Sequence, residues 1–160
     1  MSEFRIYPLL EDFLRKRKWC GSTTQNLDMR GSIGLELDVM GLRKEKRGVK
    51  LFSIEAKEND FMQVLKQAIT RTCYFDYCYI AFPYDGKSFE YVLNRIANNI
   101  DLLKKDSIGC LIVDTEKQKV YEVQPAWYQR GEKFHFREII ISKFKERSKE
   151  RSRNQKEAGE

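Results

Sequence analysis

The chain has 160 residues, 41% of them hydrophobic and 34% charged, a composition that predicts one globular domain with a core of ordinary size. No run of about 18 apolar residues is present, which excludes a membrane-spanning helix, and charges interrupt the apolar N-terminal stretch, which argues against a secretory signal. Lys and Arg number 30 against 24 Asp and Glu, and the resulting net charge of +6 favours a polyanionic partner.

Several common catalytic patterns are missing from the sequence. It contains no GxxxxGK[ST] phosphate loop, no HExxH, no GxSxG and no glycine-rich dinucleotide turn. The single histidine, His135, excludes a zinc site built from histidines. The cysteines are scattered without a CxxC pair, which indicates buried thiols of a reduced, cytoplasmic protein rather than disulfides or a metal site. They are Cys20, Cys73, Cys78 and Cys110.

The first part of the chain predicts one helix and up to three strands. Apolar residues recur with helical spacing over 4–19, which predicts an amphipathic helix. A loop or short strand follows over 23–32. Alternating polarity predicts a strand over 34–42, a charged turn from Arg43 to Gly48, and a second strand over 49–57.

The middle of the chain alternates between helices and strands. Helical spacing predicts helices over 60–75 and 88–104. Continuous apolar runs predict buried strands over 77–82, closed by Pro83, and over 108–113. A short edge strand over 119–123 pairs with the second of them.

The C-terminal part of the chain is the most ambiguous. Residues 136–147 have helical spacing but contain a β-branched run, and we interpret them as a helix rather than a strand. We expect 142–160 to be a separate basic tail, a frayed helix or disordered, following a single domain over 1–141. Helices placed between strands predict an α/β protein with a central mixed sheet.

Polar side chains lie on one face of each of the two strands expected over 34–42 and 49–57. The first of these strands has an apolar face, formed by Leu35, Leu37 and Val39. Its polar face is formed by Glu36, Asp38 and Met40. Glu55 and Lys57 share one face of the second strand, because side chains alternate with period two. Two carboxylates on matching faces of antiparallel neighbours, Asp38 and Glu55, can converge on one hard cation such as Mg²⁺. A plainer interpretation is that all three residues are solvated strand residues.

The pattern D-x(16)-E-x-K, formed by Asp38, Glu55 and Lys57, resembles the PD-(D/E)xK nuclease superfamily. The resemblance covers roughly 3–125 and is clearest over 34–83. It is similar to the pattern of archaeal Holliday-junction resolvases and of RecB-like nuclease domains. It implies a three-layer restriction-endonuclease-like fold, in which a mixed sheet is flanked by helices.

The resemblance also implies roles for neighbouring residues. The carbonyl of Ala56 would join Asp38 and Glu55 as a ligand of Mg²⁺ or Mn²⁺. Gln67, on the following helix, would face the catalytic site, and Arg71 would bind nucleic acid where some relatives carry Tyr. A Glu of the first helix would complete the metal site; we prefer Glu3, and Glu11 is the alternative.

The predicted function is therefore metal-dependent hydrolysis of DNA phosphodiesters, in repair, recombination or defence, with structure-specific substrates among the options. Asp38 and Glu55 would hold the metal, Lys57 would position the attacking water, and Gln67 would support the site. The alternatives are an inactive DNA-binding module with this fold and a subunit of a larger complex. A homodimer is expected by analogy alone, because cutting two strands needs two sites.

Two basic segments are further candidates for DNA contact. The hairpin turn carries four cations that contact phosphates or form a solvated tip, and the sequence favours neither interpretation. They are Arg43, Lys44, Lys46 and Arg47. The basic tail is expected to add affinity without specificity, or to act as a solubilising extension.

Overall fold

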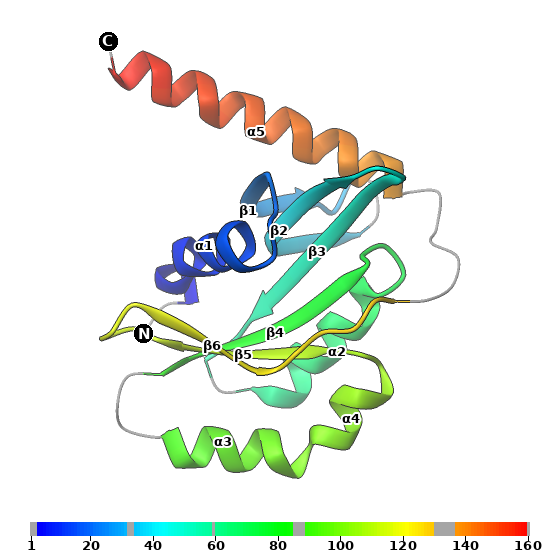
Figure 1. Cartoon of the computed structure of the whole chain (residues 1–160), viewed down its shortest axis with the longest axis vertical. Helices are drawn as coiled ribbons and strands as arrows, with labels where there is room; N and C mark the ends of the chain where they lie inside the picture. Colours follow the sequence, from blue (N-terminus) through cyan, green and yellow to red (C-terminus); the bar gives the residue numbers. More distant parts are fainter. Residues whose placement is uncertain (1–2, 32–33, 59, 85–88, 130–136, 160) are drawn as a thin grey trace.

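The protein is an α/β domain, seen here in a computed structural model that describes residues 3–31, 34–58, 60–84, 89–129 and 137–159. Six strands form one mixed sheet, which is flanked by helices (Figure 1). The strands follow chain order across the sheet: β1 (Ser22–Met29), β2 (Leu35–Glu45), β3 (Gly48–Ala56), β4 (Tyr77–Tyr84), β5 (Gly109–Asp114) and β6 (Lys119–Gln124). The predicted class, the mixed sheet and the order of helices and strands are confirmed.

The helices divide unequally between the two faces of the sheet. They are the 3₁₀ helix η1 (Glu3–Ile6), α1 (Tyr7–Arg17), α2 (Phe61–Arg71), α3 (Phe89–Asn98), α4 (Ile100–Lys105) and α5 (Arg137–Gly159). β3, β4 and β5 are parallel neighbours, whereas the other pairs are antiparallel. Crossovers that advance in one direction with the usual right-handed sense lie on one face, which explains why α2, α3 and α4 share a face. Among the described residues, no helix combines the length and the apolar character needed to cross a bilayer.

Two hydrophobic clusters fill the space on either side of the sheet. On one face, Val64 of α2 packs with Ile80 and Ile112 of the central strands, and α5 adds further residues to this cluster. On the other face, α1 packs on its own set of strand residues, including Ile54. The cysteines are unpaired, and three of them are buried as predicted, which leaves only Cys73 half-buried.

Three predicted boundaries in the middle of the chain are wrong. The helix expected over 60–75 ends at Arg71. The helix expected over 88–104 is two helices, which meet at Asn99. The strand expected to close at Pro83 continues to Tyr84. Because β3 pairs with β4 only as far as Ala81, the end of β4 has a single neighbour, and a proline is tolerated on such an edge.

The predicted alternation of β2 is wrong at Asp38. Leu37 packs in the cluster beneath α2, whereas Val39 packs in the cluster beneath α1, so the two residues lie on opposite faces. Asn26, which stands across from Asp38 on β1, has a φ of 53°, a left-handed conformation that Asn tolerates better than most residues. The apolar side chains of β2 therefore change face next to Asp38, which is half-buried.

The C-terminal helix α5 crosses the boundary that the sequence predicts at residue 142 and continues to Gly159 (Figure 1). Its first turn is anchored by Arg137, which donates two hydrogen bonds to the buried carboxylate of Asp76 at 2.9 and 2.7 Å. About four turns later Arg151 donates to Glu11 of α1 at 2.7 Å and to the backbone oxygen of Thr23 at 3.2 Å. The expected basic tail is thus helical and docked against the first helix and the first strand.

Candidate functional site

A cleft of about 480 Å³ lies where β2 and β3 meet α2, and it brings the predicted catalytic residues together. Six of its lining residues are those that the sequence pattern singles out: Asp38, Glu55, Ala56, Lys57, Gln67 and Arg71. They come from three elements that follow one another in the chain. Two strands and a helix that are consecutive in the chain therefore line the same cleft.

The two carboxylates meet because of the register between β2 and β3. The antiparallel ladder ends at the pair Val39 and Ile54, so Asp38 lies across from Glu55, one position further along. Asp38 Oδ2 accepts a hydrogen bond of 2.9 Å from the backbone N–H of Ala56. Its carboxylate is also in hydrogen-bonding contact with the carboxyl of Glu55. The site thus begins where the backbone hydrogen bonds between β2 and β3 end and the side chain of Asp38 contacts β3 instead.

Glu55 is 2% exposed and forms an ion pair with Arg71, whose Nε lies 3.0 Å from Glu55 Oε1. Burial, and after it the nearby charge of Asp38, raises the pKa of Glu55 to about 8, although Arg71 acts in the opposite direction. Burial and the second carboxylate therefore outweigh the arginine.

This raised pKa predicts how stability depends on pH in the absence of metal. Between pH 4.5 and about 8 the folded state keeps a proton on Glu55 that the unfolded chain releases. The stability that this proton contributes is fully present below pH 4.5 and is lost as the pH rises through 8. We expect urea denaturation in EDTA to show a falling free energy of unfolding, by up to about 1.4 kcal/mol per pH unit from this group.

Glu55→Gln should flatten this dependence, because an amide does not ionise. Glu36→Gln is the matched control, since Glu36 lines the same cleft from β2 but is exposed. The control should keep the slope of the wild type. Parallel slopes for the wild type and Glu55→Gln would contradict the assignment of the pH dependence to Glu55.

Lys57 and Gln67 reach the cleft from two directions. The backbone N–H of Lys57 donates to the oxygen of Ala81 at 3.1 Å, which extends the β3–β4 pairing by one residue and fixes where the lysine side chain begins. Gln67 lies on α2, one helical turn before Arg71, so both side chains face the cleft. Asp60 caps the start of α2 by accepting the N–H of Gln63 at 3.0 Å, which sets the helix in place after the short connection from β3.

The cleft also contains residues that the sequence pattern misses. Tyr7 of α1, Asn26 and Arg30 of the β1 region, and Glu36 of β2 line it as well. Arg30 is exposed and pairs with Asp28 at 2.9 Å. In the structure, Asn26 has a left-handed backbone. The amino-acid sequence does not reveal this conformation, so it gives no warning that Asn26 lines the cleft.

The two candidates for a further acidic ligand have different outcomes. The backbone of Glu3 opens η1, but its side chain lies outside the described residues. Glu11 is buried, and it accepts hydrogen bonds from Thr23 Oγ1 at 2.9 Å and from Gln25 Nε2 at 2.8 Å, in addition to Arg151. The structure therefore places Glu11 in the contact between α1, β1 and α5, and not among the residues that line the cleft.

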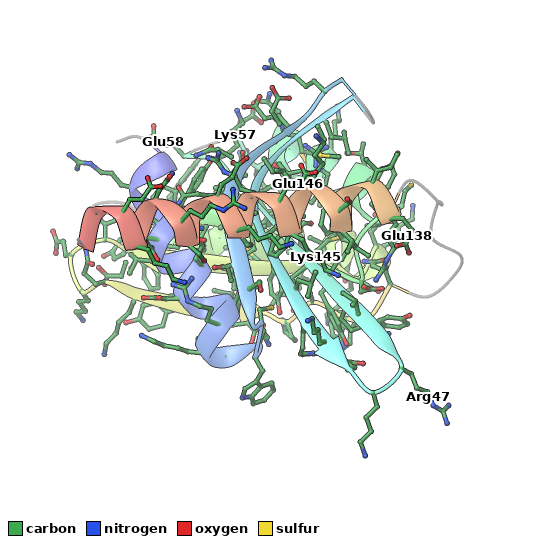
Figure 2. The ribbon with its side chains drawn as sticks, turned by 90° about the horizontal axis from the view of Figure 1, so that it is seen from above. Arg47, Lys57, Glu58, Glu138, Lys145 and Glu146 are labelled. Atoms are coloured by element: carbon green, nitrogen blue, oxygen red, sulfur yellow. The ribbon has the colours of Figure 1, made fainter. Side chains whose placement is uncertain are left out.

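The basic hairpin between β2 and β3 lies far from the cleft. Its strands continue to Glu45 and resume at Gly48, so the turn is shorter than expected. The strand from Asp38 to Glu45 spans about 23 Å at roughly 3.3 Å per residue. In Figure 2, which looks down on α5, Lys57 lies on one side of that helix and Arg47 on the other. The exposed cations of the hairpin are Lys44, Lys46 and Arg47.

Arg43 differs from its neighbours because it is half-buried and bonded within the protein. Its Nη1 donates to the backbone oxygen of Lys18 at 3.1 Å, and its Nη2 lies 2.9 Å from Glu45. The guanidinium also lies 5.1 Å from the centre of the Phe52 ring. Arg43 thus connects the end of α1 to the sheet, whereas the other hairpin cations point to solvent.

The donor set of the cleft fits a hard divalent cation. Among the described residues no group of three or more His, Cys, Asp or Glu side chains is placed to hold a metal, and His135 lies outside them. Proteins hold Mg²⁺ through one or two carboxylates, with water and substrate phosphate as the remaining ligands. Asp38 and Glu55, brought into contact in an open cleft that Ala56 also lines, match that requirement.

Comparison of the chain with protein-family models, with curated proteins and with solved structures finds no match.

Proposed function

We propose that the protein is a Mg²⁺- or Mn²⁺-dependent nuclease that hydrolyses DNA phosphodiesters and has a restriction-endonuclease-like fold. The single observation that supports this most is the contact between Asp38 and Glu55 across adjacent strands, with Lys57 in the same cleft. The order of elements around this contact, a helix, three strands and a helix, agrees with the fold that the sequence pattern implies.

The proposed metal ligands are Asp38, Glu55 and the carbonyl oxygen of Ala56. Asp38 is held toward β3 by the N–H of Ala56, and Glu55 is held by the parallel pairing of β3 with β4. When bound, Mg²⁺ supplies Lewis-acid stabilisation of the negative charge that develops on the phosphate. The protein contributes a fixed pair of oxygen ligands in a cleft that is open to a long polymer.

Lys57 and Gln67 are proposed to act on the water and the phosphate. Lys57 stands two residues after Glu55 in the chain, so its side chain enters the same cleft. Its ammonium group orients the attacking water and balances the negative charge of the pentacoordinate transition state. Gln67 offers an amide that donates to the phosphate and accepts from the water. Arg30, at the rim of the same cleft, offers a bidentate contact to a phosphate.

A cleavage panel tests the proposal. Supercoiled plasmid, linear duplex, single-stranded, flapped and branched DNA are incubated with Mg²⁺ or Mn²⁺, with EDTA in parallel. We expect cleavage of at least one substrate with metal and none with EDTA, and a loss of cleavage in Asp38→Asn. Glu36→Gln is the matched control, because it removes an exposed carboxylate from the same cleft.

The same panel separates the proposed function from its alternatives. DNA binding without metal-dependent cleavage of any substrate would favour an inactive binding module with this fold. Absence of both activities, together with a co-purifying protein, would favour a subunit of a larger complex. Equal cleavage by the wild type and Asp38→Asn would show that a contaminant, and not this cleft, cuts the DNA.

A further inference from the structure

Arg71 is bonded to the carboxyl group of Glu55, one of the two proposed metal ligands. Its side chain is 6% exposed, and Nε donates to Glu55 Oε1 at 3.0 Å. Nη2 donates to the backbone oxygen of Glu36 at 3.0 Å, and Nη1 to Thr70 Oγ1 at 2.7 Å. The guanidinium thus has a partner on each of its three nitrogens, and it bridges β2, β3 and α2.

The two carboxyl groups of the proposed metal site are already matched by two basic side chains without metal. Asp38 and Glu55 stand against Lys57 and Arg71, and all four residues line the same cleft. A divalent cation placed on Glu55 would therefore meet a guanidinium already bonded to the same carboxylate. In a partly buried site such like charges repel strongly, since little water screens them. Arg71 must leave Glu55, or a new negative charge must enter, before the cation binds tightly.

The substrate brings that negative charge. A phosphodiester in the cleft offers oxygens to a guanidinium, which favours planar bidentate contacts with phosphate. Arg71 lies on α2 one turn after Gln67, so a modest turn of its side chain transfers it from Glu55 to a phosphate near Gln67. Glu55 is then free to bind the cation.

We infer that Arg71 is a positioning residue that couples metal binding to phosphate binding: it holds Glu55 in the free protein and moves to the backbone of bound DNA when the cation takes its place. This inference rests on the proposed metal site of Asp38 and Glu55. Coupling of this kind is reciprocal, so DNA should strengthen metal binding as much as metal strengthens DNA binding. Both Asp38 and Glu55 would then be available to bind the cation only when a phosphodiester occupies the cleft.

Calorimetric titration of Mn²⁺ into the metal-free protein tests the inference without measuring cleavage. For the wild type, a short duplex with phosphorothioate linkages throughout should tighten Mn²⁺ binding about tenfold, within the usual range of such coupling. Arg71→Gln should bind Mn²⁺ about tenfold more tightly than the wild type in the absence of DNA, and the duplex should add little. Lys66→Gln is the matched control, because Lys66 is an exposed cation on the same helix.

The stability of the variant gives a second measurement. Glu55 loses its buried partner in Arg71→Gln, so the metal-free variant should melt at a lower temperature than the wild type. Mn²⁺ should raise the melting temperature of the variant more than that of the wild type, because tighter binding stabilises more. A variant that stays unfolded in both conditions would show that the cation cannot replace Arg71 and would overturn the inference.

The outcomes distinguish this inference from the proposed function. Equal Mn²⁺ affinities for the wild type and Arg71→Gln, with no gain from DNA, would overturn the role of Arg71 and leave the metal site standing. No Mn²⁺ binding by any of the proteins would overturn the metal site, and the inference with it. If Lys66→Gln also bound Mn²⁺ more tightly than the wild type, the change in affinity would come from net charge alone. That result would also overturn the role of Arg71.

Discussion

Lys57→Ala is expected to slow metal-dependent DNA cleavage by about 100- to 10,000-fold, the usual contribution of one group that acts on a proton or a charge in the transition state. Lys57 is not a metal ligand in the proposed site, so Mn²⁺ affinity should stay within a few fold of the wild type. DNA binding measured in EDTA should also persist, because a single phosphate contact contributes little to a long polymer. Single-turnover cleavage and Mn²⁺ titration together test this separation of chemistry from binding.

Lys66→Ala provides the control for Lys57→Ala. Lys66 is exposed on α2, near the cleft in sequence but not among the residues that line it. Its removal changes the net charge by the same amount and should leave the cleavage rate close to that of the wild type. A cleavage rate near the wild type for Lys57→Ala itself would show that the mechanism proposed for the lysine is wrong.

Arg137→Ala is expected to lower the free energy of unfolding by about 3–5 kcal/mol, the range for breaking a buried ion pair by removing one partner. Asp76 is 2% exposed, and besides Arg137 it accepts the backbone N–H of Leu51 at 2.7 Å. Arg137 also donates to the backbone oxygen of Val49 at 2.7 Å. The variant would leave the Asp76 carboxylate buried without a cation at the start of α5.

Urea denaturation of Arg137→Ala and of Arg153→Ala compares a buried with an exposed arginine on the same helix. Arg153 is exposed on the last turns of α5, and surface substitutions of this kind change stability by about 0.5 kcal/mol or less. A loss for Arg137→Ala below about 1 kcal/mol, the range of exposed ion pairs, would mean that water reaches Asp76.

Strongly patterned segments of the sequence predict their structure well. The apolar runs that became β4 and β5 have neighbours on both sides over most of their length, so most side chains of these strands are buried. α2 was predictable because its buried apolar residues face one cluster and Asp60 caps its first turn. In each case, local spacing and tertiary packing favour the same element.

The three residues of the D-x(16)-E-x-K pattern were predictable as a group because a short basic turn makes β2 and β3 neighbours. The change of face at Asp38 was not, since it accompanies a left-handed backbone at Asn26 on a third strand, a conformation that the amino-acid sequence does not reveal. The bond between Arg71 and Glu55 was also hidden, because alternation places residues on faces but does not say which charges meet. Pairing across elements depends on register and on helix position, and these are fixed only when the sheet assembles.

The last helix was hard to predict for a different reason. Its buried residues are Ile140 and Phe144, with Ile141 half-buried against the same cluster, so most of its length looks like a solvated polar tail. What holds its second half in place is one arginine that meets a buried carboxylate in the first helix. Such a long-range polar contact leaves no periodic signal in either segment.

The contact between Glu11 and Arg151 joins residues 140 positions apart, and this separation has a consequence for synthesis of the chain on the ribosome. At about 5–20 residues per second, roughly 7–28 s pass between the addition of Glu11 and that of Arg151. During that interval the first helix carries a carboxylate whose cation has not yet been made, so its docking on the sheet is least favourable while the chain grows. We therefore expect the nascent protein to complete its fold only after the last helix has emerged, and a chain released before Arg151 to be a target for degradation.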